Sequence, residues 1–383
     1  MKKILILVLV CTVLLSGCGK SSATKCIDKE IKPLEGFKNT EYNLETDSQN
    51  YFSQYADIFA VENGYYMLST DLLFYTDKDK IDFQPVCSNP ACNHANPECD
   101  AYIEFASSIK YYEGDIYYVA SVLKGFMSYE DTDHVYELHR RSLDGSVDEK
   151  ICDLGYGRLV LDMTIHRGYA YFRTFDGSES AILNRVKLDK TAEKEELFRN
   201  NKGELPEIYG VKGYGDGVLF CADYPSEDNP EVLKVNIYYY DSNEDAVKLV
   251  KEDADSQYAV ADGELYYYKT GGVYRYDMSS KQESLFYPSD EMVSVSYDGK
   301  YFYFNNQYEH YFLEGSEEIE DTIYVVDKEG NKIDAIEVPG YGCYDGDSDW
   351  LFQEKGDGYQ FLDKKQIGTG KFEWIYLDRP SVW

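Results

Sequence analysis

Three cysteines and a histidine lie close together in the stretch VCSNPACNHANPEC (86–99). Their order is Cys87, Cys92, His94 and Cys99, with the spacing C-x4-C-x-H-x4-C. Three thiolates and one imidazole form the closed tetrahedral ligand set that proteins use for structural zinc. Cys92 and His94 stand two residues apart, so in an extended chain both side chains point to the same side. The stretch therefore predicts a zinc site.

Oxidation of the same cysteines is a second interpretation. Outside the cytoplasmic membrane thiols can pair, and a Cys87–Cys92 or Cys92–Cys99 disulfide would close a small loop. A zinc knuckle has the same ligand order but the spacing C-x2-C-x4-H-x4-C, so only its last step matches, and the basic residues of a nucleic-acid-binding knuckle are missing. Structural metal, a disulfide clasp, or neither stay open. In neither of the first two cases do we expect catalysis, because no ligand position is left for water or substrate.

The acidic segment DGDSDW is a weaker candidate for a metal site. It places Asp345, Asp347 and Asp349 at alternate positions, as at the start of a calcium-binding loop. Such a loop has glycine at its sixth position and glutamate at its twelfth, where this chain has Trp350 and Gly356. These departures favour the competing interpretation, an acidic turn between two strands.

The N-terminus indicates the compartment. Two lysines precede the apolar run ILILVLVCTVLL (4–15), which has the length of a signal-peptide core and is short for a membrane span. The run ends in Leu-Ser-Gly-Cys18, an order that resembles the bacterial lipobox. The resemblance implies that residues 1–17 are removed and that Cys18 carries diacylglycerol. An ordinary secretory peptide, cut elsewhere, is the alternative.

The chain is strongly acidic, with 70 Asp and Glu residues, 38 Lys and Arg residues and a net charge of −32. Such a surface repels nucleic acid and anionic lipid, so electrostatic attraction cannot hold the protein at a membrane. Two acyl chains on Cys18 would be enough for stable anchoring. Residues 18–50 are polar with little periodicity, which predicts a flexible tether. We expect a lipid-anchored monomer on the extracytoplasmic face of the cell membrane that binds no nucleic acid.

Residues 51–383 contain a repeat that predicts one domain. A glycine-centred turn before a short aromatic run recurs at intervals of 36 to 54 residues, at Gly64, Gly114, Gly168, Gly217, Gly263, Gly299 and Gly346. Each is followed by a strand pattern that leads to an aspartate, at Asp77, Asp144, Asp189, Asp241, Asp277, Asp327 and Asp363. About four strands per unit at this period are typical of β-propeller blades. We expect an all-β propeller of seven four-stranded blades, with six or eight open because the first and last blades are irregular.

Tyrosine occurs 39 times, mostly inside these strand patterns. Its ring suits a half-buried strand surface, and its hydroxyl is expected to reach water. No long amphipathic helix is evident. The best local helix candidate is residues 190–206, interpreted as an excursion between blades. The segment 372–378 either completes the last blade or closes the ring.

The lipobox at Cys18, the tether and the tyrosine-rich repeats together resemble the propeller lipoproteins of Gram-positive gut anaerobes, whose repeat domain has no assigned function. That domain is distantly similar to the YWTD propellers of lipoprotein-receptor-related proteins. No blade here carries Tyr-Trp-Thr-Asp, so receptor-like ligand binding does not carry over. A cysteine–histidine segment near the first blade is a further feature of the family, and residues 87–99 are similar to it. The resemblance implies the fold and the anchor and no chemistry.

Two functions remain open. The sequence has no G-x-S-x-G elbow, no H-E-x-x-H motif and no phosphate-binding glycine loop. We therefore favour a non-catalytic module that binds a peptide, glycan or partner protein through the loops between strands. The candidate loops are 123–135, 190–207, 224–234 and 306–321. The alternative is a glycosidase-like, carbohydrate-active enzyme, which two carboxylates about 5–10 Å apart across the central channel would support.

Overall fold

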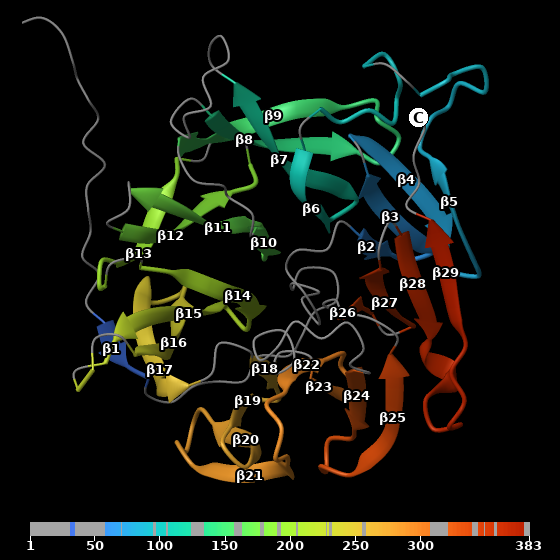
Figure 1. Cartoon of the computed structure of the whole chain (residues 1–383). Coiled ribbons are helices and arrows are strands. Elements are labelled where there is room, and N and C mark those ends of the chain that lie inside the picture. The colour runs from blue at the N-terminus through green and yellow to red at the C-terminus, as the bar shows by residue number, and fades with distance from the viewer. Residues whose placement is uncertain are drawn as a thin grey trace, which may run out of the picture.

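The computed structural model forms a ring of seven blades, each built on four antiparallel strands that follow one another in the chain (Figure 1). The prediction of an all-β, seven-bladed propeller is confirmed. The structure describes residues 31–34, 58–69, 71–94, 97–104, 106–123, 134–156, 163–176, 180–189, 193–203, 206–226, 228–229, 232–254, 258–306, 321–338, 344–347, 349–355 and 358–378.

Within each blade, chain order runs from the innermost strand to the outermost one. Blade 1 consists of β2 (Ile58–Val61), β3 (Gly64–Ser69), β4 (Leu72–Asp77) and β5 (Lys80–Pro85), and blade 2 of β6 (Ala106–Tyr112), β7 (Asp115–Leu123), β8 (His134–Ser142) and β9 (Asp148–Tyr156). Blade 3 consists of β10 (Met163–His166), β11 (Tyr169–Asp176), β12 (Ser180–Lys187) and β13 (Glu195–Asn200). Blade 4 consists of β14 (Ile208–Tyr214), β15 (Gly217–Pro225), β16 (Leu233–Asp241) and β17 (Ala246–Ala254). Blade 5 consists of β18 (Tyr258–Ala261), β19 (Glu264–Lys269), β20 (Gly272–Asp277) and β21 (Glu283–Pro288). Blade 6 consists of β22 (Ser294–Tyr297), β23 (Phe302–Asn305), β24 (Asp321–Val326) and β25 (Lys332–Val338). Blade 7 consists of β26 (Tyr344–Gly346), β27 (Trp350–Lys355), β28 (Gly358–Asp363) and β29 (Trp374–Asp378).

The predicted glycine turns are the hairpins between the first and second strands of the blades. In blade 5, Asp262 and Gly263 have φ angles of 50° and 86°, the left-handed pair that a tight two-residue hairpin requires. At Gly217 the reason for glycine is space, since a Cβ there would lie 1.8 Å from the carbonyl oxygen of Tyr240. The aspartates of the second predicted motif end, or closely follow, the third strand of each blade.

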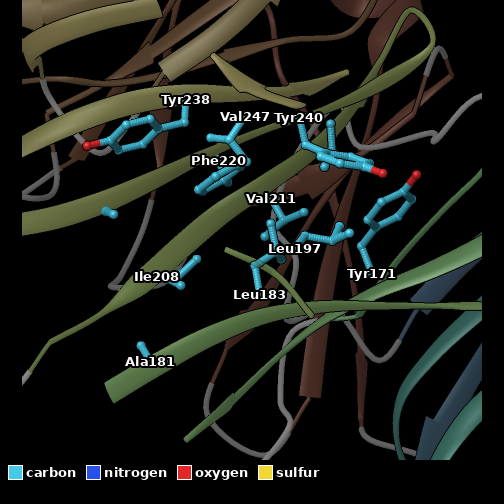
Figure 2. Close-up of a cluster of buried hydrophobic side chains, with 12 residues drawn as sticks. Tyr171, Ala181, Leu183, Leu197, Ile208, Val211, Phe220, Tyr238, Tyr240 and Val247 are labelled. Atoms are coloured by element: carbon cyan, nitrogen blue, oxygen red, sulfur yellow. The ribbon is translucent and has the colours of Figure 1, made fainter. Parts of the chain in front are cut away.

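The hydrophobic core is divided among the interfaces between neighbouring blades. Seven clusters of buried side chains are found among the described residues, one for each pair of adjacent blades. Figure 2 shows the cluster between blades 3 and 4, where Leu183 and Leu197 face Val211 and Phe220. Burial of this apolar area is the main force that holds the ring together.

Many tyrosine hydroxyls donate hydrogen bonds to carboxylates rather than reaching only water. The described pairs include Tyr65–Asp347, Tyr118–Asp148, Tyr240–Asp245, Tyr266–Glu264, Tyr267–Glu283 and Tyr303–Asp298. Burial, followed by the charge of Asp347, holds the pKa of Tyr65 far above its ordinary value, so this phenol stays protonated. Some of the carboxylates that make the chain acidic therefore accept hydrogen bonds inside the propeller.

Two segments left open by the sequence are strands of the blades. Residues 190–206 are no excursion, because they contain β13, the outermost strand of blade 3, which pairs with β12. Tertiary pairing overrides the helix-forming glutamates of this segment. The segment 372–378 contains β29, which completes blade 7 instead of closing the ring. Most of loops 123–135 and 306–321 lie outside the described residues.

A short strand lies within the segment predicted to be a tether. β1 (Ile31–Pro33) pairs in parallel with β17, the outermost strand of blade 4, and adds a fifth strand to that sheet. Leu34 is 2% exposed and packs in the cluster between blades 4 and 5. The sequence did not predict this contact, which lies far along the ring from blade 1 (Figure 1). The rest of residues 1–50 lies outside the described residues.

Candidate metal centre

The cysteine–histidine stretch belongs to the connection between β5, the outermost strand of blade 1, and β6, the innermost strand of blade 2. We call residues 86–103 the Cys/His loop, of which residues 95–96 are not described. Backbone hydrogen bonds fasten both of its ends to β4 and its turn: Val86 N–H donates to Leu73 O (2.9 Å), Leu73 N–H to Ala101 O (2.8 Å) and Ile103 N–H to Asp71 O (2.8 Å). The loop is thus held at its base by blade 1.

The four predicted ligands meet in this loop. One ligand atom from each of Cys87, Cys92, His94 and Cys99 lies within 4.8 Å of the other three, a cluster that could hold a metal ion. With zinc–sulfur distances of about 2.3 Å, sulfurs around a tetrahedral zinc are about 3.8 Å apart, so the cluster needs only a small contraction. His94 has a φ of 56°, and its Nδ1 lies 3.3 Å from the sulfur of Cys99.

Two backbone N–H groups point at sulfur atoms of the cluster. The N–H of His94 donates to Cys92 Sγ at 3.3 Å, and the N–H of Ala101 donates to Cys99 Sγ at 3.4 Å. Such bonds stabilise a negatively charged sulfur and orient it, as outer-shell partners of metal ligands do. This arrangement suits thiolates bound to a cation.

The thiols differ in how easily they lose a proton. Burial raises the pKa of Cys99 to about 12. At Cys87 burial acts in the same direction, but hydrogen bonds with the backbone of Asn89 and with Cys99 outweigh it and lower the pKa. Cys99 therefore needs a positive ion beside it to be a thiolate at neutral pH, and metal binding would release its proton.

The environment of the cluster is apolar on one side. Cys99 is 5% exposed, and Cys87 and Cys92 pack against the cluster of buried side chains between blades 1 and 7. On the outer side, the Asp100 carboxylate accepts hydrogen bonds from the hydroxyl (2.5 Å) and N–H (3.2 Å) of Ser88. Four ligand atoms are the number that a closed tetrahedral shell needs, so the site suits a structural role.

Sequence reasoning missed a residue that holds the loop from blade 2. Arg141, on β8, is 5% exposed and donates hydrogen bonds to the backbone oxygen of Asp100 and to Asp148 Oδ2 (2.9 Å). In the sequence it is one of many charged residues in strands, and no local pattern connects it with a loop some forty residues earlier.

The calcium candidates occupy the first hairpin turn of blade 7. Asp347 accepts hydrogen bonds from the Tyr65 hydroxyl (2.8 Å) and from the N–H of Asp349 (2.8 Å). The ammonium of Lys78 lies 3.4 Å from Asp347 and 3.1 Å from Asp349, so these carboxylates already have a cation. The side chain of Asp345 lies outside the described residues. Calcium binding here stays a prediction.

Two further cysteines are described, and neither joins the cluster. Cys152 is half-buried on β9, and Cys221 is fully buried on β15, where it packs as a small core residue. Cys18, Cys26 and Cys343 lie outside the described residues, so lipidation of Cys18 stays a prediction. In the part of the chain that the structure describes, no helix has the length and apolarity to cross a membrane.

Neither a family model nor a curated protein matches the chain. Among solved structures, prolyl oligopeptidase B from Galerina marginata is similar, with 13% identity and a TM-score of 0.52 over 86% of this chain and 52% of that one. Acylaminoacyl peptidase from Pyrococcus horikoshii has 11% identity and a TM-score of 0.50 over 88% of this chain and 54% of that one. TolB from Acinetobacter baumannii has 13% identity and a TM-score of 0.39 over 84% of this chain and 78% of that one.

This chain spans about half the length of the two peptidases. At these identities the likeness shows the propeller fold alone. Enzymes are among the proteins that share the fold, and no catalytic role is carried over from them.

Proposed function

We propose that this chain is a membrane-anchored, extracytoplasmic propeller that binds a peptide, a glycan or a partner protein without changing it chemically. The observation that carries the proposal is the make-up of the innermost strands β2, β6, β10, β14, β18, β22 and β26. Asp345 of β26, whose side chain is not described, is the one acidic residue in these seven strands. A glycosidase-like propeller, the alternative, needs two carboxylates facing each other, and the inner strands offer no described pair.

Polar side chains of the inner strands are instead used between blades. The hydroxyl of Thr164, on β10, donates to Val211 O at 2.9 Å. The ammonium of Lys212, on β14, donates to Tyr258 O at 2.6 Å. These bonds join blade 3 to blade 4 and blade 4 to blade 5. They support a rigid scaffold, whose binding surfaces are then built by loops.

We further propose that the Cys/His loop holds one structural zinc ion through Cys87, Cys92, His94 and Cys99. The ligand set, the short distances between ligand atoms and the N–H···S bonds support this proposal. Zinc bound there would supply positive charge for three thiolates and leave no open position for a substrate.

Anchoring and binding can be tested with one pair of variants. We expect the full chain to be recovered in the membrane fraction and Cys18→Ala to be released, because the acidic surface provides no other attraction to lipid. Cys26→Ala, a matched change nearby, should stay in the membrane fraction. Peptide and glycan arrays then test the mature chain, and bound ligand should be recovered with unchanged mass. Recovery of cleaved glycan would instead establish the enzyme.

Metal content can be measured directly by mass spectrometry on the mature chain, purified without chelator, with a thiol count on the denatured sample. We expect about one zinc per chain, lost in His94→Ala and kept in His139→Ala, since a tetrahedral site needs all four ligands. A metal-free protein with few free thiols would show that the loop is a disulfide clasp, and the zinc proposal would be wrong.

A further inference from the structure

The ring closes between blade 7 and blade 1, and this interface differs from the other six. Every other pair of neighbouring blades is joined by the chain itself, which leaves the outermost strand of one blade and enters the innermost strand of the next. Blade 7 is built only from the last four strands and blade 1 only from β2–β5. In the described residues no strand pairing connects these two blades, and the contacts described between them are made by side chains.

The described contacts of the closing interface are aromatic contacts, one ionic group and the hydrogen bond from the Tyr65 hydroxyl to Asp347. The ring of Tyr65 meets that of Phe352 edge-on, with centroids 6.1 Å apart, and Phe83 lies at the same distance from Phe361. Lys78, in the turn after β4, pairs with two aspartates of the first turn of blade 7. The side chains of Lys78 and Asp347 are 24% and 15% exposed, so water partly screens this pair, and apolar packing carries most of the stability of the interface.

The Cys/His loop packs directly on this closing interface. Cys99 and Ala101, which is 0% exposed, belong to the same buried cluster as Phe74, Phe352 and Phe361. From its other side, the loop receives the hydrogen bond of Arg141 in blade 2. Ile103, at its end, is buried between blades 1 and 2. The loop therefore contacts blade 1 and both of its neighbours.

We propose that metal binding in the Cys/His loop closes the propeller ring, by fixing the loop in the conformation that packs on the interface between blades 7 and 1. This inference rests on the proposed zinc site and states what metal binding there does to the fold. Without metal, the backbone bonds at the base of the loop and the bond from Arg141 remain. The three thiols and the imidazole lose their common partner, and Cys99 is then no longer fixed in the apolar cluster. The interface that has no covalent connection then opens before any other.

Hydrogen exchange followed by mass spectrometry tests the proposal on the mature chain, loaded with one equivalent of zinc or freed of metal under reducing conditions. Removing zinc should speed exchange at least about tenfold in blade 1 (β2–β5) and blade 7 (β26–β29). Exchange in blades 4 and 5 (β14–β21) should stay unchanged. Cys152→Ser, which changes a cysteine outside the loop, should take zinc and behave like the wild type. His94→Ala should match the metal-free protein.

Other outcomes overturn the inference in distinguishable ways. If zinc binds but only residues 86–103 change their exchange, the site is real and does not close the ring. Faster exchange in all blades would show that the metal stabilises the domain as a whole. A protein that takes no zinc would remove both this inference and the zinc proposal.

Discussion

Asp298→Asn is expected to lower the free energy of unfolding by about 3–5 kcal/mol, because it removes one partner of a buried ion pair. The carboxylate of Asp298 lies 2.6 Å from the ammonium of Lys364, and the two side chains are only 2% and 5% exposed. Asp298 stands in the first hairpin turn of blade 6, and Lys364 directly follows the third strand of blade 7. Burial lowers the pKa of Lys364, and loss of the facing carboxylate would leave its buried charge with only the weaker influence of Asp347 and Asp349.

The chain provides a matched control for this prediction. Lys328 and Asp262 form the same pair between blades 6 and 5 at 2.8 Å, but they are 45% and 70% exposed. Asp262→Asn should cost less than about 1 kcal/mol, since water solvates the remaining charge. Urea unfolding at equal metal loading compares the two variants. Equal costs would contradict the argument from burial.

Leu34→Ala is expected to cost about 2–5 kcal/mol, the range for a buried leucine that leaves a cavity. Leu34 follows β1 and packs in the core between blades 4 and 5, beside Leu219 and Tyr258. The effect is large for a residue in a segment whose sequence predicts a tether.

Ile31→Ala, in the same strand, is the control. Ile31 is 45% exposed, so its truncation should change stability by less than about 0.5 kcal/mol. Both variants can be compared by urea unfolding. The slope of the unfolding free energy against urea concentration shows whether unfolding stays two-state. If Leu34→Ala costs no more than Ile31→Ala, the N-terminal segment does not contribute to the core.

The blades could be predicted from the sequence because each blade is a local structure. Turns such as Asp262–Gly263 and third strands that lead to Asp241 or Asp277 recur within one unit, so their pattern is visible along the chain. β13 was missed for a related reason. Its sequence, EELFRN, has the glutamates and arginine of a helix, and only pairing with β12 makes it a strand.

Contacts between distant parts of the chain could not be predicted. β1 is three residues long and pairs with a strand more than two hundred residues later, which no periodicity encodes. At the candidate metal centre, the types of the four predicted ligands and their nearness in sequence indicated a cluster. The sequence could not show that the loop packs against Phe352 and Phe361, because blade 7 lies at the other end of the chain.

The position of β1 determines how mechanical tension enters the propeller. A pull on the chain before Ile31, as from an anchor at Cys18, reaches β17 and the buried Leu34 before it reaches Ile58 of blade 1. The load is then carried by blade 4, whose neighbours on both sides are joined to it by the chain. The interface between blades 7 and 1 is spared this load as long as β1 stays paired. A strand of three residues would thus decide the force at which the ring opens.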